Sequence, residues 1–131
     1  MIVVDASAFV EVALGGPGAA AVGPLLEADG DWWAPEHFTV EVISALRGLW
    51  LGGHLNADGF AAAAERMSQA AVSTYRTPPL VGRLVELAGR VSAYDAAYVA
   101  LAEELACPFL TLDRRLRSLS GVSCRFLPVS P

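Results

Sequence analysis

The sequence contains no lysine, so its nine basic residues are all arginine, and 14 acidic residues give it a formal net charge of −5. A chain that binds nucleic acid through its own charges normally carries a basic surface, because the phosphate backbone is strongly negative. The composition therefore argues against binding of that kind. Carboxylates that hold divalent cations would remove this objection, because a bound ion reverses the local charge and can itself meet a phosphate.

Cysteine is also scarce, with only two residues of this type. Cys107 and Cys124 show no CxxC spacing and have no nearby pair of histidines, which excludes the usual zinc sites. Each lies beside an expected buried strand, so we expect two reduced thiols in the core. Reduced thiols are typical of a cytosolic protein.

Long apolar segments are absent as well. The N-terminus has no basic region ahead of an apolar one, and Asp5 interrupts its first apolar run, so it does not resemble a signal peptide. No apolar stretch is long enough to cross a bilayer. We therefore expect a cytoplasmic protein that does not contact a membrane.

The length of 131 residues is typical of one domain, and we interpret residues 1–131 as a single unit. A domain of this size buries roughly two-thirds of the surface that its unfolded chain exposes, so it needs no disulfide or structural metal. The hydrophobic fraction is 54%, which is high. Either the core is large, or part of the surface is apolar and is covered by a partner.

Short apolar runs alternate with segments of helical periodicity along the whole chain. Such alternation predicts an α/β fold, with a parallel sheet of about five strands and helices on both faces. In these sheets, ligands bind beyond the carboxyl ends of the strands. The expected strands are 2–4, 32–34, 72–75, 109–112 and 125–127, and the expected helices are 6–14, 19–28, 36–51, 57–71, 79–91, 92–106 and 114–119.

Four carboxylates occupy unusual positions in this pattern. Asp5 and Asp113 each follow an apolar strand, whereas Glu41 and Asp95 lie at the buried borders of two helices. Each has a structural alternative: a strand-ending Asp can cap a helix, and a border Glu can extend to solvent. Asp95 also completes a capping box with Ser92, and the sequence does not separate that role from metal binding.

The joint pattern is more informative than any one acid. All four carboxylates can converge at the carboxyl edge of one parallel sheet. Four like charges require compensation in a small volume, and hard divalent cations that prefer oxygen ligands supply it. Magnesium commonly binds one or two carboxylates together with a substrate phosphate, so the pattern indicates phosphodiester hydrolysis.

The segments that carry these acids resemble the PIN domains of the VapC toxin group. The resemblance spans nearly the whole chain, with the acids in the expected order, and the four segments together are strongly specific. They are residues 2–8 (IVVDASA), 35–42 (PEHFTVEV), 94–102 (YDAAYVALA) and 109–116 (FLTLDRRL).

The resemblance implies a PIN fold and a metal-dependent endoribonuclease, with Mg²⁺ or Mn²⁺ as cofactor and RNA as substrate. It also implies a toxin that forms a homodimer and is bound by an antitoxin of the VapB type. The catalytic and metal-binding residues would be Asp5, Glu41, Asp95 and Asp113. Ser7 matches a small hydroxyl residue that could orient a ligand or water, or cap a helix, and Arg114 is a candidate for contacting substrate.

Two other functions remain open from the sequence. A non-catalytic binding module could share the fold, although the presence of all four acids argues against it. A phosphotransferase could use Asp5 as nucleophile, but Ser7 stands where a second acid would support that reaction, and no lysine is present to bind a phosphoryl group.

A few further residues have two interpretations each. His37 lies one helical turn before Glu41 and could reach the rim of the site, although both histidines are more simply interpreted as surface residues. The three tryptophans could stack on bases, but their positions beside buried elements favour packing in the core or at a subunit interface. They are Trp32, Trp33 and Trp50.

Overall fold

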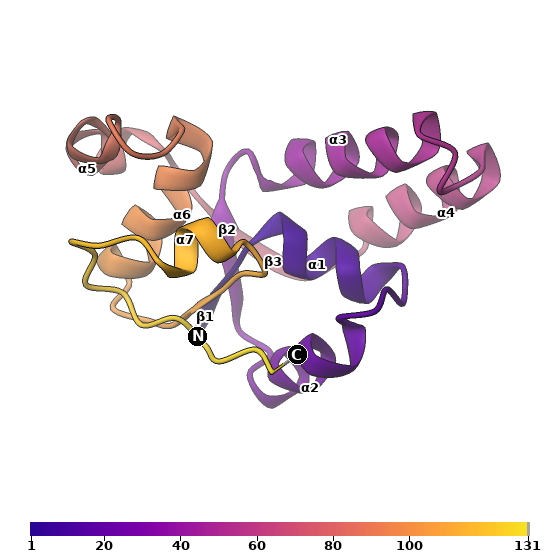
Figure 1. Cartoon of the computed structure of the whole chain (residues 1–131), viewed down its shortest axis with the longest axis horizontal. Helices are drawn as coiled ribbons and strands as arrows, with labels where there is room; N and C mark the ends of the chain where they lie inside the picture. Colours follow the sequence, from indigo (N-terminus) through magenta and orange to yellow (C-terminus); the bar gives the residue numbers. More distant parts are fainter. Residues whose placement is uncertain (131) are drawn as a thin grey trace.

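A parallel sheet of four strands, in the order β3-β2-β1-β4, forms the centre of the protein in the computed structural model, which describes residues 1–130 (Figure 1). Every neighbouring pair of strands is parallel, as the alternating pattern predicts. The strands are β1 (Ile2–Val4), β2 (Trp32–Pro35), β3 (Val72–Tyr75) and β4 (Phe109–Leu110).

Helices connect the strands and cover both faces of the sheet, as predicted. Figure 1 shows α3 and α4 running side by side at one end of the molecule, with α5 at the opposite end. The helices are α1 (Ala6–Ala13), α2 (Ala19–Ala28), α3 (Phe38–Leu51), α4 (Ala57–Ser68), α5 (Val81–Leu87), α6 (Ala93–Glu104) and α7 (Arg114–Arg117), and a short 3₁₀ helix, η1 (Pro78–Leu80), precedes α5.

The central strand β1 divides the core into two layers, because successive side chains of a strand point to opposite faces. Val3 belongs to the larger core, which includes Phe38 of α3 and Tyr98 of α6. Ile2 and Val4 belong to a second core that includes apolar side chains of α2. Burial on both faces explains why β1 is an uninterrupted run of β-branched and apolar residues.

The fifth expected strand, residues 125–127, is reduced to one isolated parallel bridge between Phe109 and Phe126. Backbone hydrogen bonds connect Phe109 to Arg125 and Leu127, but Pro128 follows and has no N–H with which to extend the pairing. The expected helix over 79–91 is also shorter, because it is divided into η1 and α5. Within residues 1–130, no helix is both long and apolar enough to cross a membrane.

The pairing of β1 with β4 positions the candidate site. Val4 lies opposite Leu110, and the amide of Asp5 donates to the carbonyl of Leu110 at 2.9 Å. Since the two strands are parallel, the residues that follow them emerge at the same edge of the sheet. Asp5 and Asp113 are therefore neighbours despite their separation in sequence.

Candidate active site

Asp5 is a buried acid at the end of β1, with 7% of its surface exposed. It occupies the N-cap position of α1, but its side chain makes no capping hydrogen bond, so a capping role does not account for it. Its Oδ2 atom instead accepts hydrogen bonds from the hydroxyls of Thr111, at 2.6 Å, and Ser7, at 2.9 Å. Burial raises the pKa of Asp5, and these two hydrogen bonds oppose the rise.

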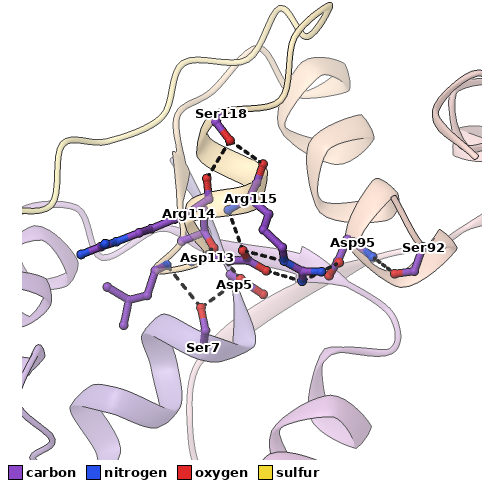
Figure 2. A network of polar contacts seen from close by, with 10 residues as sticks. Asp5, Ser7, Ser92, Asp95, Asp113, Arg114, Arg115 and Ser118 are labelled. Carbon is purple, nitrogen blue, oxygen red and sulfur yellow. Dashed lines mark hydrogen bonds and ion pairs between the residues drawn. The ribbon is translucent and has the colours of Figure 1, made fainter. Parts of the chain in front are cut away.

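Thr111 and Ser7 tie the ends of β1 and β4 together. Besides donating to Asp5, Thr111 accepts a hydrogen bond from the amide of Asp113 at 3.0 Å, and Ser7 accepts one from the amide of Leu112 at 3.3 Å. Figure 2 shows Ser7 pointing from α1 toward Asp5 and the segment after β4. The hydroxyl of Ser7 thus orients an acid of the site, whereas its expected role toward a ligand or water stays a prediction.

Glu41 lies in the first turn of α3, and Tyr98 of α6 fixes its position. The Tyr98 hydroxyl donates to Oε1 of Glu41 at 2.8 Å. Tyr98 is fully buried, and burial together with the charges of Glu41 and Asp5 raises the pKa of its hydroxyl far above the ordinary range. The hydroxyl therefore stays protonated and remains a hydrogen-bond donor.

His37 also reaches Glu41, as the helical spacing suggested. Its Nε2 atom lies 3.0 Å from Oε1 of Glu41, although the angle is not that of a hydrogen bond. The Glu41 carboxylate raises the pKa of His37, which favours the charged imidazolium. The ring is half-buried and packs edge-on against Tyr94 and Tyr98, so it is part of the site's wall rather than a free surface residue.

Asp95 lies in the first turn of α6, after the N-cap residue Ser92. The Ser92 hydroxyl accepts a hydrogen bond from the amide of Asp95 at 3.2 Å, which is one half of the expected capping box. Among residues 1–130 the reciprocal bond, from the amide of Ser92 to the Asp95 carboxylate, is not present. The carboxylate faces the site instead, where burial and the nearby charge of Asp113 raise its pKa.

Asp113 caps the short helix α7, because its Oδ1 accepts a hydrogen bond from the amide of Arg115 at 2.8 Å. The Arg115 guanidinium binds the same carboxylate, with Nη2 2.7 Å from Oδ2. This ion pair holds the pKa of Asp113 below its usual value. Nη2 of Arg115 also lies 3.8 Å from Oδ2 of Asp95, so one guanidinium lies between the two acids (Figure 2).

Arg114, the candidate for contacting substrate, lies apart from the acids. Figure 2 shows its side chain extending away from the acids. It lines a separate surface groove with Pro17, Ala21 and Leu112. The structure therefore brings Arg115, and not Arg114, to the carboxylates.

The four predicted acids form one electrostatic group. Asp5 is affected by the charges of Glu41 and Asp95, and Asp95 is affected by those of Glu41 and Asp113. However, no three of the acidic, histidine or cysteine side chains in the described part of the chain are close enough together to hold a metal ion as they stand. The acids gather at one edge of the sheet without closing around a common point.

The donor set nevertheless matches a hard divalent cation. All four acids offer carboxylate oxygens, which Mg²⁺ and Mn²⁺ prefer. Both hydroxyl contacts of Asp5 involve Oδ2, and its other oxygen, Oδ1, accepts no hydrogen bond within residues 1–130. Two of the acids, Asp5 and Asp95, have raised pKa values, so their charged forms are disfavoured, and a cation would relieve this.

Two residues of this site were missed by the sequence analysis, although each left a signal. Thr111 is a polar residue within the apolar run 109–112, and it proves to be almost completely buried. Tyr98 follows Asp95 by three residues, one helical turn along α6. The tryptophans lie elsewhere: Trp32 donates to backbone carbonyls before β2, and Trp50 stacks on Phe60 between α3 and α4.

The comparisons with known proteins agree with this geometry. A sequence profile described as "PIN domain" matches residues 2–122. Ribonuclease VapC12 of Mycobacterium tuberculosis is 36% identical over 121 residues, covering 92% of this chain and 93% of its own length. Ribonuclease VapC1 of the same species is 37% identical over 126 residues, covering 93% and 92%.

Two solved structures share the fold. The Mycobacterium tuberculosis toxin VapC20 superposes with a TM-score of 0.70 at 17% identity, covering 94% of this chain and 97% of that one. The PAE2754 protein of Pyrobaculum aerophilum gives a TM-score of 0.69 at 24% identity, covering 92% and 81%. With a profile match over most of its length and relatives above one-third identity, this chain belongs to the PIN domain family.

Proposed function

We propose that the protein is a metal-dependent endoribonuclease that hydrolyses phosphodiester bonds in RNA. One observation carries the proposal: the four acids gather at the carboxyl edge of the sheet in a chain whose similar relatives are named ribonucleases. The carboxyl edge is where parallel α/β sheets bind their ligands. The site offers carboxylate oxygens, which are the ligands that a hard divalent cation prefers.

Asp5, Asp95 and Asp113 would hold the cation, Mg²⁺ or Mn²⁺, with Glu41 bound directly or through water. When bound, such an ion supplies an activated water and stabilises negative charge on the phosphate. The remaining residues keep the acids in place. Thr111 and Ser7 fix one oxygen of Asp5 and leave the other available.

The Tyr98 hydroxyl plays the corresponding part for Glu41. It binds one carboxylate oxygen from a buried and rigid position, so the orientation of Glu41 is set before any ligand arrives. Since the ring is also stacked on Phe109 of β4, the second acid is connected to the same strand that presents Asp113. Such contacts keep the carboxylates in the position that catalysis requires. A displacement of a catalytic group by about 1 Å can lower the reaction rate on the order of a hundredfold.

We further propose a biological role as the toxin of a VapBC-type toxin–antitoxin pair in the cytoplasm. The resemblance of residues 2–8 and 109–116 to VapC toxins supports this role. Such a toxin would form a homodimer and would be inhibited by an antitoxin of the VapB type. Large apolar side chains on α5 and α6 are exposed, which supports association with a partner, because burying them against a second molecule would be favourable. A short neighbouring gene for a DNA-binding antitoxin would be the expected genomic context.

Cleavage of RNA by the purified protein tests the enzymatic proposal. Total RNA is incubated with Mg²⁺, with Mn²⁺ and with EDTA, and fragments are resolved on a denaturing gel. We expect cleavage with either ion and none in EDTA. Undiminished cleavage in EDTA would rule out the metal-dependent mechanism.

The matched variant is Asp5→Asn. Asn keeps the shape of the side chain and an oxygen that can accept from Thr111 and Ser7, but it removes the charge that a cation needs. We expect a folded protein by circular dichroism with RNA cleavage reduced at least a hundredfold. A folded variant that binds metal and cuts RNA at the parental rate would contradict the assignment of Asp5. A parent protein that binds metal and RNA but never cuts would favour a non-catalytic binding module.

A further inference from the structure

Arg115 is held by the acids of the site although its side chain is mostly solvent-exposed. Its side chain is 80% exposed, yet the guanidinium contacts both oxygens of Asp113, at 3.2 Å from Nε and 2.7 Å from Nη2. The same Nη2 atom is 3.8 Å from Asp95. Two of the proposed metal ligands therefore share a cation that belongs to the chain itself.

This occupancy and metal binding compete for the same atoms. The Arg115 guanidinium uses lone pairs on both oxygens of Asp113, and a metal ion bound there would need those lone pairs. Two cations at the same oxygens would also repel. The failure of the acids to close around a common point fits this conclusion, because Arg115 lies between Asp95 and Asp113.

The Arg115 ion pair can be broken easily. Exposed ion pairs contribute little to stability, because water solvates the separated charges and the long side chains regain their freedom. The backbone amide of Arg115 still donates to Oδ1 of Asp113, so α7 keeps its cap when the guanidinium leaves. The side chain can therefore move without loss of the helix.

A cleft lies beside Asp95, and Arg115 is already part of its lining. The cleft has a volume of about 660 Å³ and is lined by Arg90, Ser92, Asp95, Arg115 and Leu119. Arg90 is held at its edge by a hydrogen bond to the carbonyl of Ser120. With Arg115 released from the acids, two guanidinium groups would border the cleft next to Asp95. Arginine side chains suit a phosphate, because a guanidinium donates forked hydrogen bonds to the phosphate oxygens.

We propose that Arg115 is an exchangeable cation: it neutralises Asp95 and Asp113 in the metal-free protein, and it binds a phosphate of the RNA at the Arg90 cleft when a divalent ion takes its place. This inference rests on the proposed metal-dependent function. It gives the acidic, lysine-free chain a cationic contact for RNA that becomes available only when the site is loaded. The metal-free protein would accordingly have a weak affinity for RNA.

Calorimetry of Mn²⁺ binding tests the first half, with the wild type, Arg115→Gln and Arg117→Gln compared. Arg117 lies in the same helix and its removal changes the net charge equally, but within residues 1–130 it makes no ion pair or side-chain hydrogen bond with the acids. We expect Arg115→Gln to bind Mn²⁺ about 2- to 5-fold more tightly than Arg117→Gln. The reason is that Mn²⁺ no longer has to displace the Arg115 guanidinium, and breaking an exposed salt bridge changes an equilibrium constant by about this factor. Equal affinities of the two variants would overturn the exchange. If none of the three proteins binds Mn²⁺, the proposed metal-dependent function fails. That outcome is distinct from equal affinities, which would contradict only the exchange.

Binding of a fluorescein-labelled RNA of mixed sequence tests the second half. Ca²⁺ replaces Mn²⁺ to slow cleavage, and affinity is measured over a range of salt concentrations. Arg115→Gln should weaken binding and lower the log–log salt slope by about one, whereas Arg117→Gln should leave both unchanged. Arg115→Lys should restore part of the affinity through its charge. Unchanged RNA affinity and slope in Arg115→Gln would overturn the phosphate contact, whatever the calorimetry gives.

Discussion

At the scale of single residues, Asp5 shows how the site conflicts with the stability of the fold. Its carboxylate is buried, and burial is the largest influence on its pKa, larger than the opposing hydrogen bonds from Thr111 and Ser7. The charges of Glu41 and Asp95 act in the same direction as burial. The fold therefore accommodates the neutral, protonated form of Asp5 more easily than the charged carboxylate.

This conflict predicts how Asp5→Asn changes stability with pH. The pKa of Asp5 is higher in the folded protein than its ordinary value of 3.8. The contribution of Asp5 to the free energy of unfolding is therefore greatest below pH 3.8, and it is lost as the pH rises through the pKa of the folded state. Asn carries no charge at any pH. In EDTA, the variant should therefore melt above the wild type at neutral pH, and the difference should shrink as pH falls toward 4. Differential scanning calorimetry between pH 4 and pH 8 measures it.

Asp113→Asn is the control of opposite sign. Arg115 lowers the pKa of Asp113, so this group stabilises the fold above its unfolded pKa and loses that contribution as pH falls through the folded one. Asn still caps a helix, so only the charge is tested. This variant should melt at or below the wild-type temperature at neutral pH. If both variants shifted in the same direction at neutral pH, burial would not be the main influence on Asp5.

The unusual positions of the acids were visible in the sequence, and the helical spacing of His37 and Glu41 was too, but the contact of Arg115 with Asp113 was not. A charged residue that ends an apolar strand is visible in the pattern, as with Asp5 and Asp113. Whether Arg114 or Arg115 meets Asp113 depends on a rotation of about 100° between successive residues of a helix. That rotation is set by where α7 begins, and a helix of four residues leaves too few positions for periodicity to reveal it.

At the scale of elements, the N-caps of α4 and α6 form a natural pair for comparison. Asn56 and Ser92 each accept a hydrogen bond from the amide three residues later, at Gly59 and Asp95. Both satisfy an amide that the helix would otherwise leave unpaired, so both should contribute similarly to stability. Only the cap of α6 presents a residue of the candidate site.

Removing each cap should therefore separate stability from activity. Asn56→Ala and Ser92→Ala should each cost about 1 kcal/mol, equivalent to a fall in melting temperature of roughly 4 °C for a domain of this size. Ser92→Ala should also reduce RNA cleavage about tenfold or more, because the first turn of α6 orients Asp95. Asn56→Ala should keep parental cleavage at a temperature where both variants are folded. Equal activity of the two variants would show that the cap does not position Asp95.

The sequence predicted the long helices correctly, because their periodic pattern extends over many residues. It failed for the last strand, whose existence depends on hydrogen bonding to a neighbouring strand. The helix expected over 36–51 is α3, and its buried residues Phe38, Val42 and Leu46 recur at helical spacing. The last strand was not decided in this way, because a strand exists only if a neighbour pairs with it. Within residues 1–130 this last segment forms one bridge, between Phe126 and Phe109, and Pro128 prevents further pairing.

At the scale of the whole molecule, the high apolar content is only partly explained by the core. Both core layers are filled, yet several large apolar side chains remain exposed. Val81, Val85 and Tyr94, which we name the α5–α6 surface, are 50%, 70% and 62% exposed. An apolar groove between these helices, lined by Leu84 and Ala97 among others, lies next to Tyr94. Burying such groups against a second molecule would be favourable.

The α5–α6 surface predicts that the protein is a homodimer which Val85→Arg converts to a monomer. A charged side chain at an apolar contact is costly to desolvate, and a twofold axis would place the change on both sides of the interface. The control is Leu51→Arg, which adds the same charge at a residue that is 59% exposed, at the end of α3 opposite to α5 (Figure 1). Light scattering at micromolar concentration should give about twice the chain mass of 13.7 kDa for the wild type and for Leu51→Arg, and the chain mass for Val85→Arg. A monomeric wild type would contradict the dimer, and a dimeric, folded Val85→Arg would place the interface on another face of the molecule.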